Sequence, residues 1–415
     1  MSCIFMATAL LSLYSCESKI KKDNTFTPES AYVQIATGQT VLYDKDGKSI
    51  SREDDKDSCY GQDADYLKGK KMAYTKNEDG TITDQNTGLM WQEIPYTEGF
   101  SWKDAVEYCE DLKLASYDDW RAPSAKELYS ISDFSSGWPY IDTTYFSLAS
   151  GEIGKQEQYW TLNNYVGTTE EGGYSAAFGV NHVTGHIKAY AGEAPSMKDG
   201  KMPAPPNGPQ GTKGQGTAPP PPGGKNGKHF NPLLKYVRAV RGQAYGINEF
   251  TDNKNGTISD KASALMWTKD DNKEGLNWED ALNYAENSKF AGYSDWRLPN
   301  VKELQGIVDY SYAPGAQDST KNRAAIDPIF NCASITNEAG VDDFPYYWTS
   351  TSAHFTKGKP YYYAWYVAFG RAVNAEGVDF HGAGAVRFDT KHKNGPAGEG
   401  GERYYNYVRL VRNIK

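Results

Sequence analysis

The stretch Asp-Gly-Thr-Ile-Thr-Asp-Gln-Asn-Thr-Gly-Leu-Met-Trp at residues 79–91 returns as Asn-Gly-Thr-Ile-Ser-Asp-Lys-Ala-Ser-Ala-Leu-Met-Trp at residues 255–267. Both stretches end on a tryptophan, and the offset from Trp91 to Trp267 is 267 − 91 = 176 positions. The same offset relates Trp120-Arg121 to Trp296-Arg297 and Glu127 to Glu303. Self-similarity at a fixed long offset predicts two tandem copies of one domain.

Further along the chain the offset changes, so we expect the copies to differ in loop length. Tyr159-Trp160-Thr161 pairs with Tyr347-Trp348-Thr349, and we align Ala177-Phe178-Gly179 with Ala368-Phe369-Gly370. Each copy closes on a Tyr-Val-Arg-x-Val-Arg strand, at residues 236–241 and 407–412. We therefore expect copy 1 over residues 31–242 and copy 2 over residues 243–415.

Local signals for secondary structure occur twice, once in each copy. Asp79-Gly80 predicts a hairpin turn ahead of a short strand. Ser101 and Ser124 are helix N-cap residues, and Glu127 completes a capping box with Ser124. The counterparts in copy 2 are Asn255-Gly256, Asn277, Asn300 and Glu303. The remaining sequence is short aromatic strands and long loops, which predicts an α+β fold with two helices beside a small, irregular antiparallel sheet in each copy.

Residues shared by both copies are best explained by the fold that the copies share. The recurring arginine and glutamate, Arg121 with Glu127, have two interpretations: a clamp for a ligand, or an ion pair that docks the second helix. We favour the ion pair. The predicted scaffold set is Trp91, Trp120, Arg121, Glu127, Trp267, Trp296, Arg297 and Glu303.

The N-terminus has the pattern of an exported lipoprotein. Residues 4–13 are an apolar run of the length of a signal-peptide core, too short to span a bilayer. The run ends at Leu13-Tyr-Ser-Cys16, which resembles a lipobox, although no Lys or Arg precedes it. We expect residues 1–16 to be a signal peptide ending at a lipidated Cys16 and residues 17–30 to be a tether. The alternative is a simple cleaved signal. The expected location is the outer membrane or cell surface, with the lipid as the membrane anchor.

Charge is distributed unevenly along the chain. The net charge of −9 argues against a nucleic-acid partner. Residues 195–241 nevertheless carry eight Lys and Arg residues and one Asp. Within copy 1, residues 192–232 are rich in Pro and Gly, and we expect a disordered basic surface loop there. Such a loop suggests a sulfated polysaccharide as a partner, and a spacer without a partner is the alternative.

Several of these motifs together resemble the Lcl C-terminal domain family, which is named after a bacterial collagen-like adhesin. They are Gly38-Gln-Thr40, Tyr60-Gly-Gln-Asp63, the repeated stretch at 79–91, the Asp-Trp-Arg-x-Pro stretches and the closing strands. The resemblance covers roughly residues 31 to 415 as two copies. It implies a C-type-lectin-like fold and a role in surface adhesion or glycan binding.

Motifs for catalysis and for cofactor binding do not occur in the sequence. There is no nucleophile elbow, no His-Glu-x-x-His and no phosphate-binding glycine loop. His182 and His186 are four residues apart, but Val-Thr-Gly between them argues against a helix. Asn77-x-Asp79-Gly80 together with Asp84 resembles a calcium loop, but Thr75 stands at the first ligand position, where calcium loops have Asp. We predict no enzyme activity, no cofactor and no metal. Formylglycine-generating enzymes, which have a related fold, need a cysteine pair, and the residue matching Cys109 in copy 2 is Ala285.

Partner specificity should lie where the copies differ. In Tyr361-Tyr-Tyr-Ala-Trp-Tyr-Val-Ala-Phe369, alternate residues face opposite ways on a strand. Our alignment places Trp365 on the core face and Tyr362 and Tyr366 on the other, as additions found in copy 2. The rings either stack on sugars or pack under a loop or against copy 1. The candidate ligand residues are Tyr362, Tyr366, His381, Arg387 and Trp348.

Taken together, the sequence predicts a non-enzymatic extracytoplasmic protein that binds a glycan or matrix polymer. The alternative is a structural envelope component that binds another protein. An extracytoplasmic enzyme on a formylglycine-generating-enzyme-like fold is the third and least favoured hypothesis.

Overall fold

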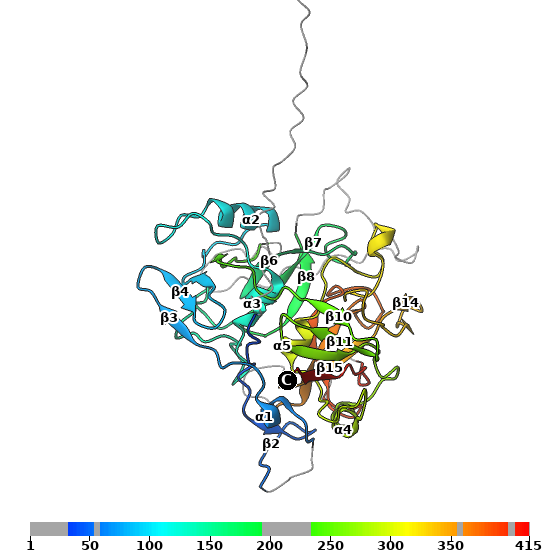
Figure 1. Cartoon of the computed structure of the whole chain (residues 1–415). Helices are drawn as coiled ribbons and strands as arrows, with labels where there is room; N and C mark the ends of the chain where they lie inside the picture. Colours follow the sequence, from blue (N-terminus) through cyan, green and yellow to red (C-terminus); the bar gives the residue numbers. More distant parts are fainter. Residues whose placement is uncertain (1–31, 54–58, 193–233, 355–359, 397–402, 415) are drawn as a thin grey trace, which may run out of the picture.

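The computed structural model describes residues 32–53, 59–192, 234–354, 360–396 and 403–414. The leader with Cys16, the tether and most of the basic loop lie outside these described residues. Short helices and several small antiparallel sheets make up the architecture, and the same set of elements appears twice (Figure 1). The predicted α+β fold with two repeated domains is therefore confirmed. Among the described residues, no helix has the length and apolar character needed to cross a bilayer.

Each copy has a four-stranded antiparallel sheet built on the repeated stretch. In copy 1 the strand order is β3 (Tyr74–Lys76), β4 (Thr81–Asp84), β5 (Met90–Gln92) and β9 (Val240–Arg241). In copy 2 it is β10 (Phe250–Asp252), β11 (Thr257–Asp260), β12 (Leu265–Thr268) and β18 (Val411–Asn413). Gly80 and Gly256 have φ of +85° in the hairpin turns, which only glycine adopts readily. The closing strand of each copy thus completes the sheet that its hairpin begins.

Two helices per copy start where the capping residues predict. They are α2 (Trp102–Asp111) and α3 (Ala125–Ser130) in copy 1, and α4 (Trp278–Asn287) and α5 (Val301–Gln305) in copy 2. Ser101 and Asn277 accept hydrogen bonds from the backbone three residues on. Ser124 and Asn300 form complete capping boxes with Glu127 and Glu303. The predicted N-caps are confirmed.

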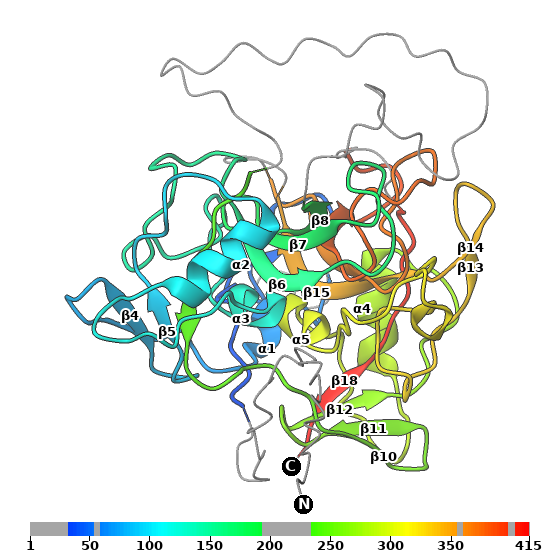
Figure 2. The ribbon, with the colours of Figure 1, turned by 90° about the horizontal axis from the view of Figure 1, so that it is seen from above.

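A six-stranded sheet runs through both copies and joins them. Copy 1 contributes β6 (Gln158–Asn164), β7 (Ala176–Asn181) and β8 (Ile187–Ala191), and copy 2 contributes β15 (Tyr346–Ala353), β16 (Tyr363–Ala368) and β17 (Val386–Thr390). The order is β15-β16-β17-β8-β7-β6, so the copies meet at the antiparallel pair β17 and β8. Helices α3 and α5 contact each other over the middle of this sheet, and α2 and α4 lie on opposite sides (Figure 2). The two copies are thus related by an approximate two-fold axis.

The predicted scaffold residues form the interior. Trp91, Trp120, Trp267 and Trp296 are buried. Arg121 donates two hydrogen bonds to Glu127, at 2.7 and 2.6 Å, and Arg297 makes the same two bonds to Glu303. Each glutamate also accepts from the N-cap backbone of its own helix. In each copy the arginine and glutamate thus form an ion pair at the start of the second helix.

The segment that precedes the first hairpin packs against copy 2. It contains β1 (Leu42–Tyr43), β2 (Ser49–Ile50) and α1 (Asp63–Tyr66). Gln39 donates to the Ser352 carbonyl and accepts from the Ser352 amide, on β15. The Tyr66 hydroxyl donates to Glu286 on α4. Sequence places this segment in copy 1, whereas its contacts tie the beginning of the chain to the second copy.

The strand register corrects our alignment of Ala177-Phe178-Gly179 with Ala368-Phe369-Gly370. Tyr366 stands opposite Trp348, as Gly179 stands opposite Trp160. Phe178 therefore corresponds to Trp365, and the alignment of Phe178 with Phe369 is wrong. The reason is a change of offset in the loop between the two strands, where sequence offers no fixed point.

Two smaller features complete the chain. Copy 2 has a short 3-10 helix, η1 (Ser319–Lys321), and a hairpin of β13 (Ile335–Thr336) and β14 (Asp342–Asp343). Cys109 and Cys332 are free thiols. No group of three or more His, Cys, Asp or Glu side chains suited to a metal ion occurs in the part of the chain that the structure describes.

Candidate functional site

Three of the five predicted ligand residues lie in one row across the six-stranded sheet. Trp348 on β15, Tyr366 on β16 and Arg387 on β17 are successive cross-strand partners. Their exposed fractions are 0%, 5% and 6%. The Tyr366 ring stacks on Tyr346 at 4.5 Å with an interplanar angle of 1°. Of the two alternatives for the Tyr366 ring, its burial agrees with packing inside the protein and not with stacking on sugars, because α4 and the closing segment cover this side of the sheet.

The two other predicted ligand residues occupy different surroundings. His381 is buried, and its pKa is lowered by burial and by the nearby cations Arg387 and Lys188. Tyr362 is half-buried at the edge of the main core, where the turn at Gly47 lies against its backbone. Its position agrees with packing under a loop. The five residues therefore do not form one accessible site.

An accessible cleft lies elsewhere, between the N-terminal segment and copy 1. Its volume is about 430 Å³, within the range of roughly 300–1,000 Å³ that holds small ligands. Three stretches of chain line it, at residues 36–40, 63–74 and 133–145. Two glycines allow the walls to approach: a Cβ on Gly38 would lie 2.6 Å from the Asp133 carboxylate, and one on Gly69 would lie 2.6 Å from the Ala36 amide nitrogen.

Two tyrosine rings lie side by side in this cleft. Tyr74 comes from β3 and Tyr145 from the loop after α3, with ring centroids 5.4 Å apart. Tyr74 also packs edge-on against Phe146 behind it, at 4.9 Å. In copy 2 the corresponding pair is Phe250 and Phe330 at 5.1 Å. Copy 1 thus adds a phenol hydroxyl on Tyr74 and one more ring, Tyr145, where copy 2 has Ile329 before Phe330.

Charged groups of both signs border the rings. Asp63, Asp133 and Asp142 line the cleft together with Lys68 and Lys71. Asp63 is 3% exposed and accepts hydrogen bonds from the hydroxyls of Thr37, at 2.6 Å, and of Thr351, at 2.8 Å. Burial raises the pKa of Asp63 to about 6. The cleft thus combines planar apolar rings with hydrogen-bonding groups around them.

Behind Tyr74, copy 1 differs from copy 2 in its buried polar contacts. Asp84 is the cross-strand partner of Tyr74. Among the described residues, the Tyr74 hydroxyl and Asp84 Oδ2 have no hydrogen-bond partner. In copy 2 the equivalent Asp260 Oδ2 accepts from Asn248 and Ser263. An unsatisfied buried polar atom costs about 1–3 kcal/mol, and folded proteins retain few of them. Copy 1 therefore keeps unused hydrogen-bonding capacity behind the wall of its cleft.

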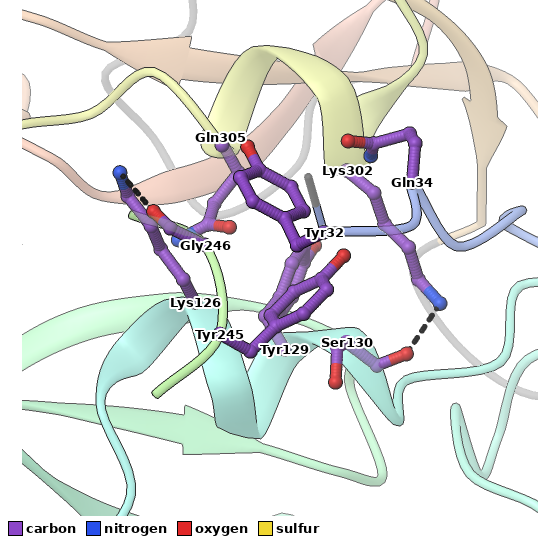
Figure 3. Close-up of a pocket in the computed structure, with 10 residues that line it drawn as sticks. Tyr32, Gln34, Lys126, Tyr129, Ser130, Tyr245, Gly246, Lys302 and Gln305 are labelled. Carbon is purple, nitrogen blue, oxygen red and sulfur yellow. Dashed lines mark hydrogen bonds between the residues drawn. The ribbon is translucent and has the colours of Figure 1, made fainter. Parts of the chain in front are cut away.

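A small pocket on the two-fold axis lies next to the cleft (Figure 3). It measures about 10 Å³, and equivalent residues of the two copies line it, including Lys126 of α3 and Lys302 of α5. Figure 3 shows the two lysine side chains on opposite sides of the pocket with tyrosine rings between them. The Lys302 ammonium donates to the carbonyls of Ala36 and Ser130 and contacts Met72 Sδ. Lys302 of copy 2 thus holds two residues of the cleft wall.

Our sequence interpretation missed the cleft. The motifs Gly38-Gln-Thr40 and Tyr60-Gly-Gln-Asp63 carry part of the family resemblance, yet we assigned them no role. The structure brings them together: Thr37 bonds Asp63, and the Tyr43 amide donates to Gln62. The rule that specificity lies where the copies differ would have found Tyr74 opposite Phe250, because these positions fall within the constant offset of 176.

A comparison with protein families finds one match. The model of the Lcl C-terminal domain matches residues 80–198 and 256–412, one region in each copy. The cleft residues before residue 80 lie outside the matched regions, and those at 133–145 lie inside them. No curated protein and no solved structure matches the chain. The match covers more than half of the sequence, and the chain belongs to the Lcl C-terminal domain family.

Proposed function

We propose that this protein is a non-enzymatic, extracytoplasmic binding protein of C-type-lectin-like fold, that its ligand is a glycan or matrix polymer, and that the cleft of copy 1 holds this ligand. The observation that carries the proposal is the pair of rings, Tyr74 and Tyr145, in a cleft bordered by carboxylates and ammonium groups. Tyrosine rings offer a flat apolar surface to the C–H faces of a sugar at little cost in rotamer freedom. Asp and Lys side chains around them supply acceptors and donors for sugar hydroxyls.

The comparison between copies supports the choice of this cleft. Copy 2 carries Phe250 where copy 1 has Tyr74, and Ile329 precedes Phe330 where Tyr145 precedes Phe146. Its equivalent carboxylate is saturated by protein groups. Copy 1 therefore departs from the shared scaffold by gaining polar and aromatic groups at one place, which is what a ligand site requires and what packing alone does not.

The test is binding of the purified protein to a glycan array, followed by affinity measurements on the best ligand. Tyr145→Ala is expected to weaken binding at least about tenfold, or about 1.4 kcal/mol, as loss of a central aromatic contact does. Tyr74→Phe removes one hydroxyl and copies the residue that copy 2 already tolerates. Tyr174→Ala is the control, because Tyr174 is 52% exposed and does not line the cleft.

Two results would count against this proposal. Binding that is equal in Tyr145→Ala and Tyr174→Ala would remove the cleft as the site. An array without any ligand, together with one protein that co-purifies in stoichiometric amount, would favour the alternative of a structural envelope component.

We also propose that Cys16 is acylated and anchors the protein to the outer membrane or cell surface. The support is the apolar run that ends at a lipobox-like Leu13-Tyr-Ser-Cys16. Buried acyl chains contribute about 0.8 kcal/mol per CH₂ group, so several chains hold a protein firmly. Expressed with its own leader, the Cys16→Ala variant is expected to leave the membrane fraction. If it enters detergent as the wild type does, the lipoprotein assignment is wrong.

A further inference from the structure

The two-fold axis gives each copy an equivalent lysine, but the partners of the two lysines differ. Lys126 of α3 reaches across to copy 2, where its ammonium donates to Asn248 Oδ1 at 2.6 Å and to the Gly246 carbonyl at 3.2 Å. Lys302 of α5 reaches across to copy 1, where the position equivalent to Asn248 is Met72. Only the first of these contacts joins an amine to a carboxamide.

The Asn248 side chain is fixed in orientation by a carboxylate. Its Nδ2 group donates to Asp260 Oδ2 at 2.8 Å and to the Tyr32 hydroxyl at 3.2 Å. An ionised carboxylate only accepts hydrogen bonds, so the amide nitrogen must face Asp260 and the carbonyl must face Lys126. Asp260 is itself 0% exposed and held by the backbone amides of Glu249 and Ala262. Lys126, Asn248 and Asp260 are thus joined by consecutive hydrogen bonds, in which Lys126 donates to Asn248 and Asn248 donates to Asp260.

We propose that Lys126 and Asn248 form an intramolecular isopeptide bond that links copy 1 covalently to copy 2. The lysine nitrogen attacks Cγ of Asn248, a new N–C bond forms, and the bond from Cγ to Nδ2 breaks. Two protons leave the attacking nitrogen and two reach the departing nitrogen, and Asp260, which is hydrogen-bonded to Nδ2, is the group that passes protons to the departing nitrogen. Starting from the lysine ammonium and the carboxamide, the products are a secondary amide and one ammonium ion, so atoms and charge balance without a co-reactant.

The surroundings favour this reaction over a simple hydrogen bond. Positioned reactants reach effective concentrations far above those in solution, and here both groups are held by second contacts. Burial lowers the pKa of Lys126 to about 8, against the opposing effect of Asp309 and Asp260. An appreciable fraction of the Lys126 side chain is therefore unprotonated near pH 7, and the unprotonated amine is the form that acts as a nucleophile.

Copy 1 provides an internal control for the same chemistry. Lys302 has the same environment of an amine near Asp84 and Asp133, but the thioether of Met72 cannot be attacked by an amine. The proposal therefore predicts one isopeptide bond in the native chain, between Lys126 and Asn248, and none between Lys302 and Met72.

Peptide mass mapping of the full chain tests the proposal. The wild type is expected to yield the peptides containing Lys126 and Asn248 as one linked species, lighter than their sum by one ammonia. Asn248→Ala should give the two peptides separately at full mass, and Asp260→Asn should slow or abolish linkage. Asn253→Ala is the matched control, since the Asn253 amide donates to the hydroxyls of Thr257 and Ser259.

A gain of function makes the test independent of damaged folding. Met72→Asn is expected to create a second link, from position 72 to Lys302, and a second loss of ammonia. Separate Lys126 and Asn248 peptides at full mass in the folded wild type would overturn the proposal. Loss of ammonia that persists in Asn248→Ala would overturn the assignment of the residues.

Discussion

Ile187 of copy 1 stands directly opposite Val386 of copy 2, at the place where the strands of the two copies pair. Both side chains are fully buried, and they belong to one core cluster that contains residues of both copies. Strand β8 would be an unpaired edge of the sheet without copy 2, and strand β17 would be one without copy 1. The repeat is therefore a pair of domains that share one sheet and one core.

A shared core predicts that the copies unfold together. Ile187→Ala should destabilise the whole protein by about 2–5 kcal/mol, as large-to-small changes in a core do. Denaturant unfolding followed by tryptophan fluorescence and by far-UV circular dichroism should give coincident single transitions in both proteins. Two transitions, with only the first moved by the substitution, would contradict a common core.

The two arginine–glutamate pairs provide a matched comparison of burial. The Arg297 side chain is 4% exposed and the Arg121 side chain 29%, while both glutamates are 1% exposed. Removing one partner of a buried pair leaves an uncompensated charge, which costs about 3–5 kcal/mol. Arg297→Ala should therefore lower the free energy of unfolding more than Arg121→Ala does. Urea titration measures both free energies of unfolding. Equal losses in the two variants would contradict the prediction, because they would mean that water does not screen the charge left at the more exposed Arg121 site.

Asp63 should make stability depend on pH. Its pKa is raised to about 6 by burial, from 3.8, so between these values the folded protein holds a proton that the unfolded chain has released. The free energy of unfolding then falls as pH rises through this range, by about 3 kcal/mol in total. Asp63→Asn can still accept the two threonine hydroxyls and should remove this fall. The two proteins are expected to be equally stable at pH 4 and to differ at pH 7, with the variant the more stable.

If instead Asp63→Asn and wild type keep a constant difference from pH 4 to pH 7, Asp63 does not titrate in this range. The measurement is urea unfolding at closely spaced pH values.

Tyr366 should behave as a core residue. It is 5% exposed and stacked on Tyr346, so Tyr366→Ala should cost about 3–5 kcal/mol and lower the melting temperature strongly. Tyr362 is half-buried, and Tyr362→Ala should cost less. A melting temperature that barely moves in Tyr366→Ala would show that the covering side of the sheet is open in solution.

The parts of the fold that sequence predicted are those that local chemistry determines. Hairpin turns, N-caps and the Arg–Glu pairs follow from residues close together in the chain, and each occurs twice. The joint between β8 and β17 has no such signal, because pairing between distant strands depends on the assembled shape of both copies. The choice between stacking and packing for Tyr366 stayed open for a related reason: alternation along a strand separates two faces but does not say what covers each of them.

The candidate site was missed because its walls come from three separate stretches of chain. Gly38, Asp63 and Tyr145 become neighbours only in the folded protein. In the sequence they show no common period and no common spacing. The difference between Tyr74 and Phe250 was available from the repeat, but its meaning depends on the cleft in front of it.

Gln39 exchanges two hydrogen bonds with Ser352, 313 positions further along the chain. A ribosome releases a polypeptide from its N-terminus onward, so the earliest segment has no surface to settle on until most of the chain has been made. Contacts of such large separation also form slowly, because a long loop must close first. The Gln39 segment can therefore reach its final position only after residue 352 has been made. The first part of the chain to be synthesised is thus among the last parts to find its place.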